Sequence, residues 1–81
     1  MKLIAHRGNI DGPNVNEENK PEYIIQAIER GYFVEIDLWC KDNTLYLGHD
    51  LPQYEIEYSF LIVNKYKLFI HCKNIQALQY I

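Results

Sequence analysis

The chain has 81 residues, of which 48% are hydrophobic and 23% are charged, and its formal net charge at pH 7 is −3. These values are ordinary for a globular protein and exclude disordered, collagen-like and coiled-coil chains. Eight basic residues against eleven acidic ones offer no positive surface for a nucleic-acid backbone. A chain this short buries only about 60 to 65% of its unfolded surface, so its core must be small.

The apolar runs are short. Residues 60–63 form one of the longest, whereas a membrane-spanning helix needs roughly 20 apolar residues. The N-terminal residues lead directly to His6 and Arg7, which leaves no room for the apolar stretch of a secretory signal. We therefore expect a cytoplasmic protein without a transmembrane segment. Cys40 and Cys72 lie too far apart for a zinc knuckle and are expected to be reduced thiols.

The first elements alternate between strand and helix. Residues 2–6 form an apolar run that predicts a strand, and turn-forming residues fill the loop at 8–16. Pro21 suits the first turn of a helix that Gly31 ends. Residues 34–39 alternate between apolar and other side chains, which predicts a second strand.

At the start of the predicted helix that begins at Pro21, Lys20 is a poor N-cap residue, which leaves Asn19 as a candidate for the cap.

The rest of the chain contains a turn and three further segments. Residues 42–43 predict a turn, after which residues 44–48 return as an extended segment that ends at His49. Residues 54–63 alternate like a strand at first and then resemble a helix. Residues 68–73 predict a third main strand.

Asn74 is a good N-cap for a last helix that begins at Ile75. Its apolar face would carry Ile75, Leu78 and Ile81.

Alternation of strands with helices indicates an α/β fold built from parallel βαβ units. Such units build both doubly wound sheets and (β/α) barrels. We expect about three parallel strands with intervening helices, which form part of an incomplete (β/α) TIM-barrel-like structure. A complete barrel needs more chain than this. Either the sequence is a piece of a larger barrel, or copies associate as a homo-oligomer that completes the sheet.

Glu35 and Asp37 would lie on the same face of the second strand, because residues two apart in a strand point the same way. Two adjacent carboxylates repel each other unless a cation or proton lies between them, and divalent ions with oxygen ligands meet this need. We therefore predict a metal at Glu35 and Asp37, with His71 as a third ligand. Mg²⁺, Ca²⁺ and Mn²⁺ are candidates, and the nitrogen donor also admits Zn²⁺. A solvated polar strand face is the alternative.

His6 and His49 each lie where a strand ends, the usual place for catalysis in such folds, and histidine titrates near neutral pH. We predict that they act as an acid and base pair. Arg7 offers a fork that matches a phosphate, and Lys73 adds a second positive charge. Together these residues suit the hydrolysis of a phosphodiester.

Four motifs occur in one order along the chain: His6-Arg7-Gly8, Glu18-Asn19 before the helix, Glu35-Ile36-Asp37 and His49-Asp50. This series resembles the glycerophosphodiester phosphodiesterase family. The resemblance covers residues 3–50 well and residues 69–74 more loosely, and it implies that residues 1–81 are the N-terminal portion of such a domain.

The resemblance implies a TIM barrel of the phosphatidylinositol-phospholipase-C-like kind. It also implies that the protein takes part in lipid metabolism. It implies metal-dependent hydrolysis of glycerophosphodiesters to glycerol 3-phosphate and an alcohol. His6 and His49 match the acid and base pair of the family, Glu35 and Asp37 match its metal-binding carboxylates, and Arg7 matches its phosphate-contacting arginine.

The sequence departs from the family pattern at the third strand. His71-Cys72-Lys73 stands where the family has a metal-binding glutamate in a Glu-x-Lys motif. Two alternatives therefore stay open beside the enzyme: an inactive phosphate-binding or assembly fragment of such a barrel, and a zinc site that uses His71, Cys72 and a further histidine.

Overall fold

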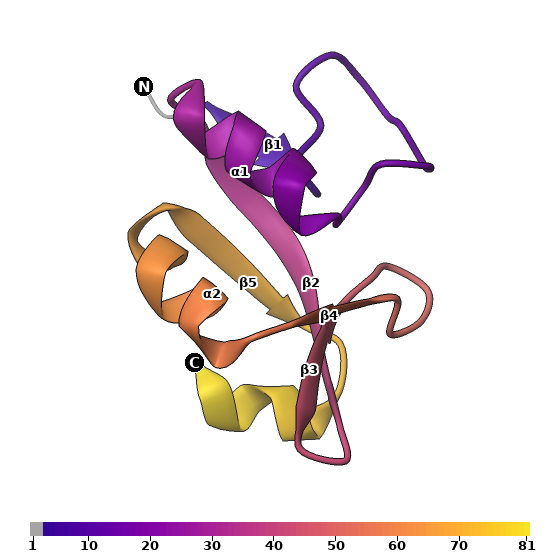
Figure 1. Ribbon diagram of the computed structural model, residues 1–81. Helices are drawn as coiled ribbons and strands as arrows, with labels where there is room; N and C mark the ends of the chain where they lie inside the picture. The colour runs from indigo at the N-terminus through magenta and orange to yellow at the C-terminus, as the bar shows by residue number, and fades with distance from the viewer. Residues whose placement is uncertain (1–2) are drawn as a thin grey trace.

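The computed structural model describes residues 3–81, so the expected strand at 2–6 lies partly outside the described residues. Five strands form one mixed sheet (Figure 1). The elements follow in chain order: β1 Ile4–His6, α1 Pro21–Glu29, β2 Phe33–Lys41, β3 Thr44–Leu47, β4 Tyr54–Ile56, α2 Tyr58–Asn64, the 3₁₀ helix η1 Lys65–Lys67, β5 Leu68–Cys72 and the 3₁₀ helix η2 Ile75–Tyr80.

The long strand β2 organises the sheet. β1 and β5 pair with it in parallel, whereas β3 pairs with it antiparallel and β4 pairs antiparallel with β3. The expected barrel-like arrangement of parallel strands with intervening helices is therefore wrong. The physical reason is the turn at Asp42 and Asn43, which both have left-handed backbone angles, with φ of 52° and 63°. A two-residue turn of this kind closes an antiparallel hairpin, whereas a parallel pair needs a long crossover.

β1 and β3 lie end to end along the same edge of β2. The backbone N–H of Arg7 donates to the Glu35 carbonyl at 2.7 Å, and that of Gly48 donates to the Asp37 carbonyl at 3.1 Å. Carbonyls two residues apart point to the same edge of a strand. The chain leaves β1 and β3 at neighbouring points, so the segments that follow both strands meet beside Asp37.

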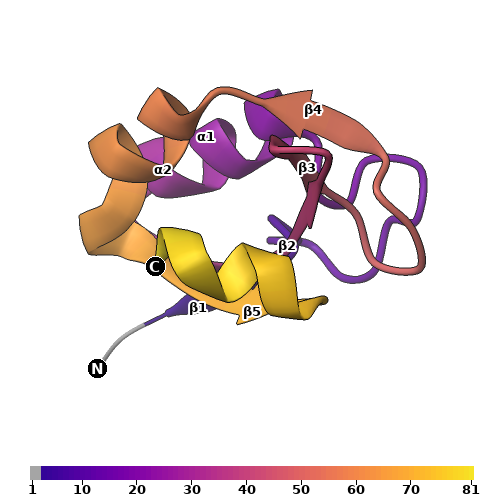
Figure 2. The same cartoon turned by 90° about the horizontal axis from the view of Figure 1, so that it is seen from below.

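The two faces of the sheet differ in chemistry. Val34, Ile36 and Leu38 of β2 are fully buried on one face, together with Ile24 and Ala27 of α1. Figure 2 shows α1 and α2 on the same side of β1 and β5. The alternation of β2 therefore separates an apolar, helix-covered face from a face that carries Glu35 and Asp37, as the sequence predicts.

The helix α1 begins at Pro21 and ends before Gly31, whose φ of +91° is suited to glycine. Lys20 is its N-cap residue and forms no side-chain cap bond. The suggestion that Asn19 caps α1 is wrong, because the Asn19 side chain bonds Asp37 instead.

The last element begins as expected: Asn74 caps it by accepting a bond from the N–H of Ala77 at 3.2 Å. It is a 3₁₀ helix, however, and its buried residue is Ala77. Ile75, Leu78 and Ile81 are 80%, 55% and 60% exposed. The expected apolar face therefore points outward, because a 3₁₀ helix aligns every third residue and here aligns these three on the solvent side.

Candidate active site at the junction of β1 and β3

The Asp37 carboxylate is the centre of the candidate site, and its side chain is only 2% exposed. Asn19 Nδ2 donates to Asp37 Oδ2 at 3.0 Å, and the backbone N–H of Asp37 donates to Asn19 Oδ1 at 3.1 Å. Arg7 Nε lies 3.2 Å from the same Oδ2. A buried carboxylate is stable only when such partners compensate for lost hydration.

Two histidines also approach Asp37. His49 Nδ1 lies 3.5 Å from Oδ2, and His71 Nδ1 lies 3.3 Å from Oδ1. His49 comes from the segment after β3, whereas His71 is the partner of Asp37 in the parallel register of β5. The structure therefore brings Arg7, Asp37, His49 and His71 together from four different strands or strand ends.

Arg7 connects this centre to Glu18. Its Nη1 donates to Glu18 Oε1 at 3.2 Å, and its Nη2 lies 3.3 Å from His49 Nε2. Asn9 Nδ2 and the backbone N–H of Asn14 donate to Glu18 Oε2 at 3.0 and 3.1 Å. These hydrogen bonds, first that from Asn9 and then that from Arg7, hold the pKa of Glu18 below its ordinary value despite burial.

The backbone is constrained at two residues of the site. Arg7 and Asn19 have positive φ angles of 57° and 67°, and the N–H of Asn19 donates to the Arg7 carbonyl at 3.0 Å. Such angles cost free energy in residues other than glycine and are found preferentially at functional sites. The fold thus holds the Arg7 and Asn19 side chains on Asp37 at an energetic cost.

Two nitrogens at the site are buried without a well-aligned hydrogen bond: Arg7 Nε and His49 Nδ1. Both lie close to Asp37 Oδ2, so they interact with it as charges or dipoles. A buried donor that lacks an aligned acceptor costs free energy. An anionic ligand, or a small movement of the carboxylate, would relieve this cost.

His6 and Glu35 form a second pair on the same face. His6 Nδ1 lies 3.1 Å from Glu35 Oε1, and the two side chains are 71% and 35% exposed. They are paired neighbours in the parallel register of β1 and β2, and Glu35 lies two residues before Asp37. The two predicted catalytic histidines therefore belong to neighbouring clusters: His6 with Glu35, and His49 with Asp37.

Lys73 is the predicted site residue that does not join these clusters. Its backbone N–H donates to the Leu38 carbonyl at 2.8 Å, and within residues 3–81 its side chain forms no hydrogen bond or ion pair with the site. Cys72 packs against the apolar core, on the opposite face from His71. Burial raises the pKa of the Cys72 thiol, which favours the protonated form over a zinc-binding thiolate.

Sequence reasoning missed the supporting role of Glu18, Asn19, Asn9 and Tyr23. The Tyr23 hydroxyl donates to Asn9 Oδ1 at 3.0 Å, and Asn9 in turn orients Glu18. Glu18 and Asn19 carried a signal, since they stand together just before α1 in a motif of the resembled family. Asn9 lies in a loop rich in polar residues and carried none.

The charges of the site favour an added cation. Glu18, Glu35 and Asp37 give three negative charges against the single positive charge of Arg7 when the histidines are neutral. Carboxylate oxygens with one imidazole nitrogen are a donor set that divalent ions accept. In the arrangement of residues 3–81, however, no three His, Cys, Asp or Glu side chains converge as a metal-binding group. The donor types fit a divalent ion, and their side chains must move to enclose one.

An open cavity of about 340 Å³ lies beside these clusters, lined by Glu35, Phe69, Ile70 and His71. A larger groove of about 440 Å³ lies along α2, away from the site. The smaller cavity is the one that adjoins the titratable groups, and it leaves room for a ligand beside Glu35 and His71.

Comparison of the chain with protein-family models, curated proteins and solved structures gives no match. Within residues 3–81, no helix combines the length and the apolar character needed to cross a membrane.

Proposed function

We propose that the junction of β1 and β3 binds a phosphodiester and hydrolyses it with the help of a divalent cation. The observation that carries this proposal is the contact of Arg7 with both Asp37 and His49. It joins a phosphate-binding guanidinium, a buried carboxylate and a half-exposed imidazole. The order of motifs resembling the glycerophosphodiester phosphodiesterases supplies the substrate class, with glycerol 3-phosphate and an alcohol as products.

The proposed roles follow from position and exposure. Arg7 holds a phosphate oxygen through its guanidinium, and Glu18 and Asp37 fix the orientation of that guanidinium. His49 is 44% exposed and can transfer a proton to or from an oxygen of the bound diester. His6 is more exposed and would serve as its partner in proton transfer. Lys73, two residues after His71 in the chain, would contribute a positive charge.

A divalent cation would be held by Glu35 and Asp37, with His71 as a third ligand. It would supply polarisation of a phosphoryl oxygen. Mg²⁺, Ca²⁺ and Mn²⁺ suit the carboxylates, whereas Zn²⁺ also suits His71. The excess of negative charge at the site supports this proposal, because an anionic diester would otherwise approach three carboxylates.

We place this activity in the cytoplasm. Cys40 and Cys72 are both free thiols, a state favoured by a reducing compartment.

The test is hydrolysis of glycerophosphocholine by chelator-treated protein to which Mg²⁺, Ca²⁺, Mn²⁺ or Zn²⁺ is added in turn. Glycerol 3-phosphate release with at least one of these ions, and none with the chelator, supports the proposal. Glu35→Gln should weaken the binding of the added ion, so that the ion no longer stimulates hydrolysis as it does in the wild type. Calorimetry with glycerol 3-phosphate identifies the alternative: binding without turnover under any of these ions would indicate a phosphate-binding fragment rather than an enzyme.

A further inference from the structure

The helical segment formed by α2 and η1 has an apolar stripe on its outer side. Ser59, Ile62, Val63 and Tyr66 are all exposed, the last three to 51%, 68% and 73%. Ser59, Ile62 and Val63 follow the i, i+3, i+4 spacing of one face of α2, and Tyr66 comes next to it in η1. The inner side is formed by Leu61 and Asn64, which are buried. A surface helix normally has its polar face outward, so an exposed apolar stripe is unusual for a helix in contact with water.

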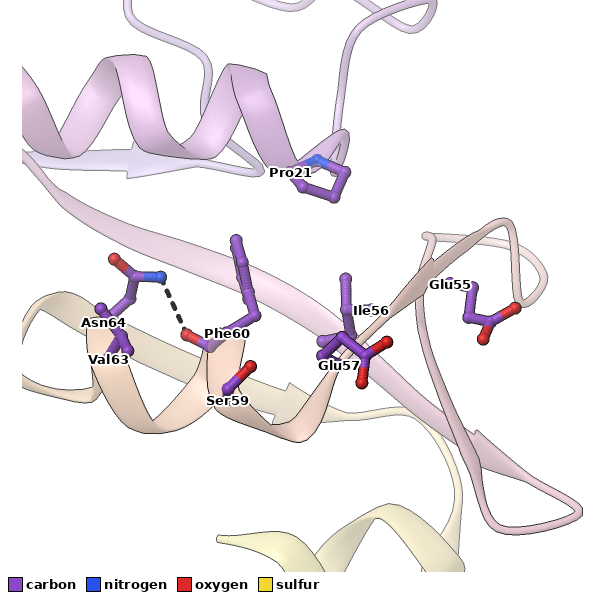
Figure 3. A pocket seen from close by; sticks show the side chains of 8 residues that line it. All are labelled: Pro21, Glu55, Ile56, Glu57, Ser59, Phe60, Val63 and Asn64. Carbon is purple, nitrogen blue, oxygen red and sulfur yellow. Dashed lines mark hydrogen bonds between the residues drawn. The ribbon is translucent and has the colours of Figure 1, made fainter.

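A groove of about 440 Å³ runs beside the stripe. Figure 3 shows Phe60 of α2 pointing toward Pro21 at the start of α1, with Ser59 and Val63 on the near side of α2. Ser59 and Val63 belong both to the stripe and to the lining of the groove. An apolar side chain that approached Ser59 would therefore enter the groove.

Charge is distributed unevenly along this segment. Glu55 and Glu57 precede α2 and Lys65 follows it, and all three are exposed. Within residues 3–81 none of the three takes part in an ion pair. The segment is therefore acidic at its start and basic at its end, with an apolar stripe between. Two such segments complement each other in charge only when they pack antiparallel.

We propose that a second copy of this chain docks on the stripe, with the two α2 helices antiparallel about a twofold axis. The twofold axis places Ile62 of one copy against Val63 of the other. It also places the large Tyr66 side chain over the small Ser59, at the entrance of the groove. The exposed Glu57 then lies near Lys65 of the other copy. Because each contact occurs twice, one self-complementary surface satisfies both copies.

The same features argue against other occupants. A membrane surface would favour lysines alone around the stripe, whereas Glu55 and Glu57 repel anionic lipids. The contact is small for a protein interface, so the dimer should be weak and depend on concentration. The stripe lies on α2, on the helix-covered side of the sheet, and is separate from the candidate site. This inference therefore does not depend on the proposed function.

The test is sedimentation equilibrium of the purified chain from about 5 to 500 µM, a range suited to a weak interface. We expect a monomer–dimer equilibrium. Val63→Glu should weaken the dimer at least tenfold, because it buries two unpaired carboxylates at the axis. Ile75→Glu is the matched control, since Ile75 is also an exposed apolar residue but lies on η2, and it should leave the equilibrium unchanged. Circular dichroism of each variant checks that the fold is kept.

Charge reversal tests the antiparallel arrangement. Glu57→Lys and Lys65→Glu should each weaken the dimer, and the two changes combined in one chain should restore it. A wild-type chain that stays monomeric over the whole range would overturn the proposal. A dimer that is insensitive to Val63→Glu, or a double charge reversal that fails to restore it, would also overturn it.

Discussion

Asn19 and Asp37 exchange two hydrogen bonds inside the protein, one to a carboxylate oxygen and one from a backbone N–H. Both residues are almost fully buried, at 1% exposure each. Through this pair the loop before α1 is fixed to the middle of β2. The same Asp37 carboxylate receives Arg7 and His49, so the pair connects the stability of the fold to the geometry of the candidate site.

Asn19→Ala should lower the free energy of unfolding by about 2–3 kcal/mol, because it leaves the buried N–H of Asp37 without a partner and removes one hydrogen bond from the buried carboxylate. Urea unfolding followed by circular dichroism measures this. Asn16→Ala is the matched control, since Asn16 is an exposed residue of the same loop. Equal stability of the two variants would contradict the role given to Asn19.

Gly8 is expected to be more sensitive to substitution than Gly12, although both have a left-handed backbone, with φ of 89° and 97°. A Cβ at Gly8 would lie 2.7 Å from Tyr23 Cδ2, whereas a Cβ at Gly12 would meet nothing within 4 Å. Gly12→Ala should cost about 1 kcal/mol from the backbone alone. Gly8→Ala should lower the free energy of unfolding by about 1–3 kcal/mol more than Gly12→Ala does, because its Cβ is overpacked against Tyr23. Thermal unfolding of both variants gives the difference, which should disappear if Tyr23 has no fixed place over Gly8.

Stability should fall in acid partly because of Glu18. The folded-state pKa of Glu18 is lowered from its ordinary value of 4.5, so its contribution is complete above that value and is lost as pH falls through the lower, folded-state pKa. Glu18→Gln should therefore be less stable than wild type at pH 7, with a difference that shrinks below about pH 4. Urea unfolding at several pH values measures the trend. Glu29→Gln, at an exposed position on α1, should show no such trend.

His49→Ala should reduce the rate of diester hydrolysis by about 10² to 10⁴-fold, the usual contribution of a group that transfers a proton. Its side chain is half-exposed, so the fold should persist. His6→Ala should lower the rate by a similar factor if the two histidines share proton transfer. Wild-type rates in both variants would remove the histidines from the proposed mechanism.

The sequence predicted individual elements better than it predicted their arrangement. Local patterns were sufficient for β2, whose alternation placed Val34, Ile36 and Leu38 in the core, and for α1, which begins at Pro21. The direction of β3 depends on the two left-handed residues at Asp42 and Asn43. The turn was predicted, but its consequence for a mixed sheet was not drawn. The last helix begins at Ile75 with the predicted cap, but the prediction that Ile75, Leu78 and Ile81 form its packed face was wrong, because the choice between α and 3₁₀ geometry depends on packing around Ala77.

The candidate site shows the same division. Spacing of two residues correctly placed Glu35 and Asp37 on one face, because strand geometry is local. The contact of Arg7 with Glu18, and of Asn19 with Asp37, could not be derived from periodicity, since it depends on how the loop between β1 and α1 folds back. The meeting of Arg7 and His49 depends on β1 and β3 sharing an edge of β2, which is a property of the whole sheet.

The most direct test of this account is a ¹H–¹⁵N NMR titration of the chain with glycerol 3-phosphate. It is run once without a divalent ion and once with Mg²⁺ or Ca²⁺, which are diamagnetic and therefore preferable to Mn²⁺. The account predicts that the Arg7 guanidinium, the His49 imidazole and the Asn19 side-chain amide shift together and saturate at one ligand concentration, whereas α2 signals stay in place. Shifts confined to surface lysines, or the absence of any shift at Arg7 and His49, would contradict the assignment of this junction as a phosphate-ester site.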